Sequence, residues 1–221
     1  MRTTLSINCV MELLTVCVSH NYFQLKDRFY NQVSGLPMGG VLSPIISNIF
    51  MDHFEDIAFE NWSIKPKIWL RYVDDVFCVW ENKINIQDEF LKHINSIRPS
   101  IKFTIENEVN SEIPFLDILI TKTKENTIKT TLFYKKTFSG QYLNYNSNHP
   151  QHVKIGLVQS LFQKINHLIT DNEDKILGEN YTTELLIKNN YPPSIIERAK
   201  AKNKSCKQIT KTDNPKYLTT V

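Results

Sequence analysis

The chain has 221 residues, of which 41% are hydrophobic and 22% are charged, and this ordinary globular composition excludes wholesale disorder. The net charge of +3 conceals an asymmetry, because residues 1–121 hold 10 Lys and Arg against 15 Asp and Glu, whereas residues 122–221 hold 16 against 8. Charge segregated in this way predicts an acidic half that holds cations and a basic half that holds phosphates, unless the halves are only solvated surfaces of unlike sign.

The cysteines and the apolar runs of the sequence indicate where in the cell the protein is expected. The four cysteines show no CxxC spacing, which predicts reduced thiols in an intracellular protein. No apolar run approaches the roughly 20 residues of a membrane span, so we expect no membrane partner. Glu12 interrupts the apolar residues 5–18 and no small-residue cleavage site follows, which disfavours a signal peptide.

The first predicted elements are a helix and a hairpin. Apolar side chains recur near a helical period over residues 5–18 and predict an amphipathic helix. The runs Tyr22-Phe23 and Arg28-Phe29-Tyr30 flank the polar turn Lys26-Asp27, which predicts a short β-hairpin. A glycine- and proline-rich loop over residues 35–40 follows the hairpin.

The next elements surround a pair of acidic residues. Ser43 and Pro44 open a predicted helix, with the Ser43 hydroxyl as its N-cap and the proline at the first helical position. Two strands over residues 68–72 and 76–80 are predicted around a tight turn. An amphipathic helix is predicted over residues 86–97, before a proline.

The second half of the chain changes from strands to helices. Strands are predicted over residues 101–105, 115–120 and 128–134. A helical stripe runs from residue 153 to residue 168, shorter helices are expected around 182–190 and 194–202, and residues 206–221 are expected to be a frayed tail. The predicted fold class is α+β, an antiparallel sheet with helices on one face and a helical appendage.

Asp74 and Asp75 are adjacent carboxylates at the tip of an apolar hairpin. Like charges this close repel, and burying them costs several kcal/mol unless a cation compensates. Hard oxygen ligands of this kind suit Mg²⁺, which takes one or two carboxylates together with substrate phosphates. The alternative is that Asp-Asp is ordinary, solvated turn chemistry.

The loop before the predicted helix at Ser43 has the sequence QVSGLPMGG. Its glycines permit close approach of the backbone to a flat or charged ligand, and the helix N-terminus that follows favours phosphate. The alternative is an ordinary connection between a hairpin and a helix. We expect the turn at Asp74 and Asp75 to face the groove beside this loop.

Three runs of sequence, taken in their order, resemble the palm of a reverse transcriptase. They are QVSGLPMGGVLSPIISNIFMDHFE, WLRYVDDVFCVW and IKFTIENEVNSEIPFLDILI. The group they resemble most is the Penelope-like retroelements, relatives of telomerase reverse transcriptase, which also carry a downstream segment similar to Tyr142-Leu143 and residues 147–150. The resemblance implies a right-hand polymerase palm that is incomplete at its N-terminus, over residues 1–148, and a helical thumb-like region over residues 149–205.

The resemblance also assigns roles to individual residues. Asp74 and Asp75 stand where the family holds catalytic Mg²⁺, with Mn²⁺ as an alternative, for two-metal nucleotidyl transfer. The implied partners are an RNA template, a DNA primer and deoxynucleoside triphosphates. The residues implied to line the templating base and the incoming nucleotide are Gln32, Gly35, Pro37, Met38 and Gly39. Strands near residues 115–119 and 132–134 would grip the primer.

The basic tail resembles a polymerase thumb. The lysines expected to grip backbone phosphates of an RNA–DNA hybrid are Lys135, Lys136, Lys154 and Lys164. Each of them could instead be a solvated surface charge. Aromatic side chains interleave with these lysines, which suggests base stacking, although core packing is the better expectation for Phe133.

One catalytic residue of the family has no counterpart here. The family's first palm strand carries a third aspartate in a segment of the type D-x-x-x-x-Y-T-N-I-P, whereas Glu12 and Asp27, the acidic residues before Gly35, lie in other contexts. We therefore expect an element truncated just after that motif. A barrier raised by about 4 kcal/mol slows chemistry roughly a thousandfold, so the chain alone should be a weak or inactive polymerase.

Two other interpretations stay open. The first is a non-catalytic nucleic-acid-binding remnant that uses only the basic tail. The second is a helical interaction module whose tail is a helix-turn-helix, which would make the order of the motifs a coincidence. The nucleus is the expected compartment on the grounds of retroelement biology, since only the lysine-rich residues 198–207 resemble an import signal.

Overall fold

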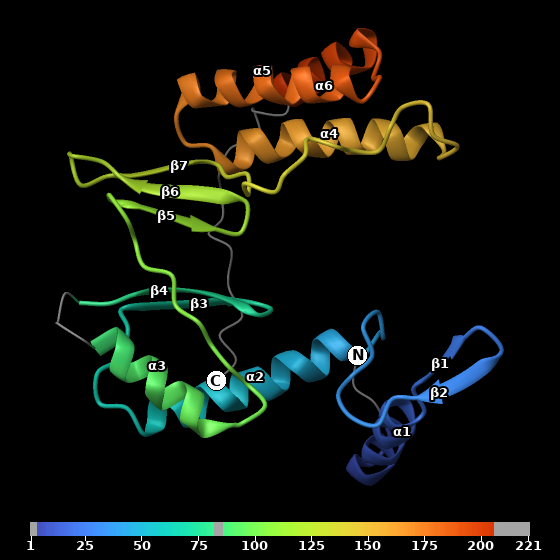
Figure 1. The fold of residues 1–221 in the computed structure, drawn as a ribbon, viewed down its shortest axis with the longest axis vertical. Helices are drawn as coiled ribbons and strands as arrows, with labels where there is room; N and C mark the ends of the chain where they lie inside the picture. The colour runs from blue at the N-terminus through green and yellow to red at the C-terminus, as the bar shows by residue number, and fades with distance from the viewer. Residues whose placement is uncertain (1–3, 82–85, 206–221) are drawn as a thin grey trace. The chain divides into compact units, whose positions relative to one another are not determined.

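The computed structural model describes residues 4–81 and 86–205 of the chain, with side chains up to residue 203. The chain divides into two compact units, Met1–Ile105 and Glu106–Val221 (Figure 1), which are described separately below. The expected boundary between palm and thumb at residue 148 stays a prediction. The tail predicted over residues 206–221 lies outside the described residues.

The first unit begins with the helix and the hairpin that the sequence predicts. Helix α1 spans Ile7–Ser19, and the side chain of Ser6 caps it by accepting a hydrogen bond from the backbone N–H of Cys9 at 3.2 Å. Strands β1 (Tyr22–Leu25) and β2 (Arg28–Asn31) pair antiparallel around the Lys26-Asp27 turn. None of the side chains in these three elements is buried.

The core of the first unit lies between two helices and a second hairpin. Helix α2 (Ser43–Glu60) packs against α3 (Ile86–Ile97), and strands β3 (Ile68–Tyr72) and β4 (Asp75–Val79) pair antiparallel. Both helices bury apolar residues spaced four apart, as one face of a helix requires. The buried cluster consists of Phe54, Ala58, Phe90 and Ile94.

The predicted N-cap of α2 is wrong. Leu42 is the N-cap residue, and it makes no side-chain capping hydrogen bond. The Ser43 hydroxyl instead donates to the backbone carbonyl of Pro37 at 2.7 Å, which ties the glycine–proline loop to the first turn of the helix. Pro44 does lie in that first turn, where its missing N–H leaves no hydrogen bond unmade.

Residues 101–105 do not form the predicted strand. The Asn95 side chain satisfies the backbone of Phe103 on both sides: Oδ1 accepts from its N–H at 2.7 Å, and Nδ2 donates to its carbonyl at 3.0 Å. The side chains of Ile101 and Phe103 pack against the α2–α3 core. The alternation of apolar and polar residues does reflect one side that packs against the core. The hydrogen bonds that a neighbouring strand would make to this backbone come instead from the side chain of Asn95 on α3.

The second unit begins with a three-stranded antiparallel sheet in the order β5–β6–β7. Its strands span Glu112–Phe115, Ile118–Lys122 and Ile128–Leu132. The single strand predicted over residues 115–120 is instead broken by a tight turn at residues 116–117, where Leu116 has a positive φ of 52°. The sheet is consequently a pair of successive hairpins.

Three helices complete the second unit, and α4 lies between β7 and the other two (Figure 1). Helix α4 spans Gln151–Leu168, α5 spans Asn172–Lys188 and α6 spans Pro193–Ser205. The predicted helix at 182–190 is thus the last part of a longer one. The shared core consists of Val158, Phe162, Ile165, Ile169, Leu186, Tyr191, Ile196 and Ala199.

The described residues thus combine helices with small antiparallel sheets, as the predicted α+β class requires. They form three separate small sheets rather than one large sheet. No helix among them is long and apolar enough to cross a membrane.

Candidate functional site

The acidic pair lies at a two-residue turn between β3 and β4. Tyr72 pairs with Asp75 across the strands, which leaves Val73 and Asp74 as the turn residues. Val73 has a φ of 57°, a conformation that a β-branched residue adopts at a cost of about 1–3 kcal/mol. Glycine is the usual residue in this kind of hairpin turn. The strain therefore marks this turn as one whose shape is held by its surroundings.

Both carboxylates of the pair are exposed. Cross-strand partners share a face of the sheet, so Asp75 lies on the face of Tyr72, opposite the face that carries Trp69 and Arg71. In the part of the chain that the structure describes, neither the Asp74 carboxylate nor the Asp75 carboxylate has a hydrogen bond or an ion pair within the protein. All their oxygens are free to accept a cation.

This donor set fits Mg²⁺ only in combination with other ligands. Among the described residues, no group of three or more His, Cys, Asp or Glu side chains is placed to hold a metal ion. Mg²⁺ is commonly bound by one or two carboxylates, with water and substrate phosphates completing its octahedron. The pair at residues 74–75 is of that open kind.

Arg71 joins the hairpin to α2. Its Nε donates to Glu55 Oε1 at 2.7 Å, its Nη1 donates to Asn48 Oδ1 at 3.1 Å, and its Nη2 pairs with Asp52. Trp69 Nε1 also donates to Glu55 Oε1, at 3.0 Å. The face of β3 that carries Trp69 and Arg71 is therefore fixed to one side of α2.

The glycine–proline loop is a tight turn held from within. The Gly40 N–H donates to the Pro37 carbonyl at 3.2 Å, and Gly39 has a φ of 85°, which only glycine adopts without strain. The Ser43 hydroxyl donates to the same carbonyl. Met38 at the tip of this turn is fully exposed, at 105% of its reference surface. The turn thus presents the Met38 side chain to solvent.

A surface cavity of about 310 Å³ joins this loop to the β1–β2 hairpin. Three of the residues predicted to contact the template or nucleotide line it, namely Gln32, Pro37 and Met38. Gly35 and Gly39 belong to the same loop but do not line the cavity. The remaining lining residues, which the sequence did not single out, are His20, Asn21, Tyr22 and Phe23.

The acidic turn and the glycine–proline loop both belong to the first unit. Among the described residues, no hydrogen bond or ion pair joins the two segments. Their juxtaposition across one groove stays a prediction.

The four lysines predicted to bind phosphates fall into two pairs. Lys135 and Lys136 follow β7 and are exposed, and their ammonium groups have no hydrogen bond or ion pair in the described part of the chain. Lys154 donates to the Ser147 carbonyl at 2.6 Å and lies over the Tyr145 ring, 5.2 Å from its centroid. Lys164 pairs with Asp117 at 2.7 Å. Only the first pair is free to meet a phosphate without breaking an internal contact.

An aromatic cluster adjoins the two free lysines. Tyr134 stacks on Phe138 with ring centroids 4.9 Å apart, and meets Tyr181 edge-on at 5.2 Å. Phe138 also contacts Tyr142, whose pKa is raised to about 12 chiefly by burial. Tyr181 is 42% exposed, so the cluster reaches the surface, and Tyr134 immediately precedes Lys135 along the chain.

Asn189 connects the loop after this cluster to the end of α5. Its Nδ2 donates to the carbonyls of Gly140 and Leu185, at 2.9 and 2.8 Å, and its Oδ1 accepts from the Tyr142 N–H at 3.0 Å. Its backbone carbonyl accepts from the Tyr145 N–H. One buried amide therefore sets the path of residues 140–145 against the helices.

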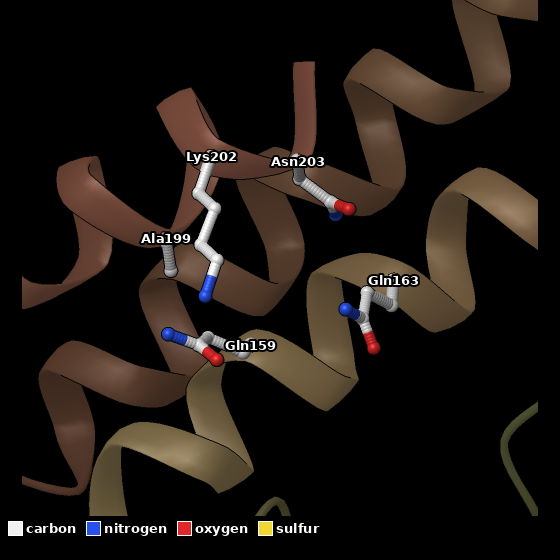
Figure 2. A pocket seen from close by; sticks show the side chains of 5 residues that line it. All are labelled: Gln159, Gln163, Ala199, Lys202 and Asn203. Carbon is white, nitrogen blue, oxygen red and sulfur yellow. The ribbon is translucent and has the colours of Figure 1, made fainter. Parts of the chain in front are cut away.

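A second, much smaller cavity lies between α4 and α6 (Figure 2). Its volume of about 30 Å³ holds a water molecule and excludes a nucleotide. The Nδ2 atom of Asn203 is buried without a hydrogen-bond partner among the described residues, as expected beside a water site. The lining residues are Gln159, Gln163, Ala199, Lys202 and Asn203.

Sequence reasoning missed Arg71, the aromatic wall of the larger cavity and Asn189. Arg71 lies inside a motif that was chosen for its aspartates, and its partners are 16 to 23 residues away in sequence. The acceptors Asn48, Asp52 and Glu55 are spaced four and three apart on α2, which was the one signal that could have revealed a polar stripe on that helix.

Two protein families match different parts of the chain. Residues 2–108 match the family described as reverse transcriptase (RNA-dependent DNA polymerase). Residues 141–201 match the animal helix-turn-helix domain. No curated protein and no solved structure gives a significant match. Residues 2–108, which contain the acidic turn and the glycine–proline loop, are thus similar to a reverse transcriptase domain.

Proposed function

We propose that the chain forms part of an RNA-directed DNA polymerase of a Penelope-like retroelement, with Asp74 and Asp75 as its metal ligands. The observation that carries the proposal is the placement of two unpaired carboxylates at a strained turn, within the segment that matches reverse transcriptases. The QVSGLPMGG loop, in the same matched segment, supports it.

Each group of residues has a task in the proposed reaction. Asp74 and Asp75 would bind Mg²⁺, which in this chemistry lowers the barrier by stabilising the charge that develops on the attacking and leaving oxygens. Gln32, Pro37 and Met38 would contact the templating base or the incoming nucleotide at the larger cavity. Lys135 and Lys136 would contact backbone phosphates of the template–primer duplex.

We infer that this polypeptide acts weakly by itself, because Glu12 and Asp27, the acidic residues within 1–34, lie outside any segment of the type that carries the family's third aspartate. Two carboxylates attract a cation with nucleotide phosphates, but a ligand that bridges two ions is not among these residues. We therefore propose that the 221-residue chain binds Mg²⁺–nucleotide and extends a primer weakly or not at all.

The test measures nucleotide binding and primer extension separately. Binding of a fluorescent deoxynucleoside triphosphate to the chain should require Mg²⁺ or Mn²⁺, and should weaken at least about tenfold in an Asp74→Asn, Asp75→Asn variant. Asp56→Asn is the matched control, because Asp56 is an exposed acidic residue of α2. Metal-independent binding, or equal binding by the two variants, contradicts the proposed site. Robust primer extension on an RNA template, if Asp74→Ala abolishes it, would contradict only the proposal that the chain is a weak polymerase. It would leave the proposed metal site in place.

A second candidate function is binding of duplex DNA by the second unit, which the match of residues 141–201 to a helix-turn-helix domain favours. Helices α5 and α6 are joined by the four residues 189–192, a connection of the length found in such motifs. Asn190 has a φ of 65°, the left-handed conformation that the turn of a helix-turn-helix often gives to glycine.

The exposed side of α6 has residues suited to base edges. Ser194, Glu197 and Arg198 are exposed near its N-terminus, and the Arg198 guanidinium has no hydrogen bond or ion pair among the described residues. Arginine pairs with guanine and glutamate with cytosine in the major groove. This candidate differs from the thumb-like one in its ligand, because a thumb would hold an RNA–DNA hybrid by its backbone.

Fluorescence anisotropy with labelled duplex DNA and with an RNA–DNA hybrid distinguishes the helix-turn-helix function from the thumb-like function. For either ligand the logarithm of affinity should fall linearly with the logarithm of salt, with a slope of about −0.9 per phosphate contact. A preference for duplex DNA that Arg198→Ala removes supports the helix-turn-helix function. A preference for the hybrid supports the thumb, and affinity independent of salt contradicts both. Lys124→Ala, in an exposed turn, is the control.

A further inference from the structure

We propose that Arg71 is a positioning residue, which holds the Asp74–Asp75 turn in place by binding three acceptors on α2. The proposal rests on the proposed function of the acidic pair. It assigns a task to a side chain that contacts neither substrate nor metal and lies on the opposite face of β3 from Asp75.

The first argument is the geometry of the contact. The guanidinium reaches Asn48, Asp52 and Glu55, which lie one above another on the same side of α2. A planar group with several fixed donors determines both the distance and the rotation of β3 relative to the helix. A lysine could supply the charge but not this set of divergent hydrogen bonds.

The second argument is the position of Arg71 along the hairpin. The end of the hairpin away from the turn is fixed in the core, where Trp69 packs against Phe59 and Trp80 packs against Phe90. Toward the turn, Arg71 is the last residue of β3 on the side facing α2, and Tyr72 and Val73 are exposed. Arg71 is thus the last residue of β3 before the turn whose side chain contacts α2.

The third argument is the strain at Val73. A left-handed β-branched residue persists only where neighbouring contacts over-determine the backbone. The Arg71 side chain is 10% exposed and that of Glu55 is 16% exposed, so their ion pair is largely shielded from water and from salt. A shielded ion pair contributes little net stability compared with well-packed apolar side chains, because desolvation opposes it. Its effect is better explained as fixing the position of the hairpin.

The experiment compares Arg71→Met and Arg71→Lys with the wild-type chain, and uses Lys67→Met as the control. Lys67 precedes β3 and pairs with Glu81, with both side chains more than half exposed. Two quantities are measured on the full chain: hydrogen exchange of the amides of residues 68–79, and Mn²⁺ affinity by electron paramagnetic resonance. Arg71→Met should speed exchange about tenfold and weaken Mn²⁺ binding about tenfold. Arg71→Lys should fall between, and Lys67→Met should match wild type.

Two results would overturn the proposal. One is hairpin exchange in Arg71→Met no faster than in Lys67→Met. The other is faster exchange with unchanged Mn²⁺ affinity, which would mean that Arg71 has a merely structural role. If Arg71→Met does not fold, the double variant Asn48→Ala, Asp52→Ala removes the two exposed acceptors and leaves Glu55 in place. This double variant should speed hydrogen exchange of residues 68–79 about threefold and weaken Mn²⁺ binding about threefold. If either quantity is unchanged, the proposal is overturned.

A different result concerns the acidic pair itself. A wild-type chain that binds no Mn²⁺, or binds it equally well in an Asp74→Asn, Asp75→Asn variant, contradicts the proposed function. In that case the exchange rates of residues 68–79 alone decide whether Arg71 holds the turn.

Discussion

Gly140 shows how a single residue constrains the second unit. It has a φ of 72°, and a Cβ added there would lie 2.8 Å from Leu185 Cδ2. Gly140→Ala combines left-handed backbone strain with overpacking of a buried leucine, so it should lower the free energy of unfolding by about 2–4 kcal/mol. Urea unfolding followed by circular dichroism measures this change.

The control is another glycine of the same unit. Gly156 lies inside α4, and a Cβ added there would meet nothing within 4 Å. Gly156→Ala should raise the free energy of unfolding by up to about 1 kcal/mol, since alanine has the higher helix propensity. Equal effects of the two substitutions would contradict the account of Gly140.

Cys78 provides a test at the residue scale in the first unit. Burial raises the pKa of its thiol, and a hydrogen bond with Trp80 opposes that rise only in part. Cys9 and Cys17 are exposed. Because the thiolate is the reactive form, iodoacetamide at about pH 8 should modify Cys78 roughly tenfold more slowly than either of them.

Peptide mapping by mass spectrometry reads the three sites separately. The rates should converge in denaturant, where Cys78 loses its burial. Raising the pH should increase the rate at Cys78 over a higher range than at the exposed cysteines. A native Cys78 that reacts as fast as Cys9 contradicts its placement on β4.

At the scale of elements, the sequence was informative wherever a segment had a clear apolar face. The helix predicted over residues 86–97 has the observed bounds, because Ile86, Phe90 and Ile94 recur every four residues and are buried together. The strand predicted over residues 101–105 failed for a tertiary reason, since the Asn95 side chain satisfies its backbone. Such a partner is invisible in a local pattern.

Helix α5 shows the opposite case. The sequence does not predict a helix over its first ten residues, because the segment has no simple apolar face. In the structure Ile176 and Leu177, two apolar residues of this segment, are exposed. The signals for its start were nevertheless present. The Asp171 side chain caps the helix by accepting from the Glu173 N–H at 2.7 Å, and Glu173 and Asp174 place acidic groups in the first turn.

The contact between the end of α5 and the loop of residues 140–145 supports a prediction at this scale. Asn189→Ala removes an amide that contacts Gly140, Tyr142 and Leu185, and leaves the Gly140 carbonyl and the Tyr142 N–H without their side-chain partner. The free energy of unfolding should fall by about 2–4 kcal/mol. Denaturant unfolding of the full chain measures it.

Asn180 is the matched control, because it is an exposed asparagine within α5, the helix that Asn189 caps. Asn180→Ala should leave the free energy of unfolding unchanged or raise it slightly, in line with the helix propensity of alanine. An Asn189→Ala variant as stable as Asn180→Ala would show that the buried amide does not hold the loop.

At the scale of the whole molecule, the chemical groups of the candidate site were predictable and their supports were not. Asp74, Asp75 and the QVSGLPMGG loop stand out in the sequence because their residue types and order suit one chemistry. Arg71 and the aromatic residues that line the larger cavity acquire a task only through contacts between elements distant in sequence. Which lysines are free to bind phosphate also depended on the fold, since Lys154 and Lys164 have internal partners.

The account depends above all on Asp74 and Asp75 binding a divalent cation together. Replacing Mg²⁺ by Fe²⁺ in the presence of ascorbate and peroxide generates hydroxyl radicals at the bound metal, which cleave the nearby backbone. We predict cleavage within residues 72–77 of the full chain, suppressed by excess Mg²⁺ and absent from an Asp74→Asn, Asp75→Asn variant. Cleavage that is missing from this segment, or that persists in the variant, would contradict the account.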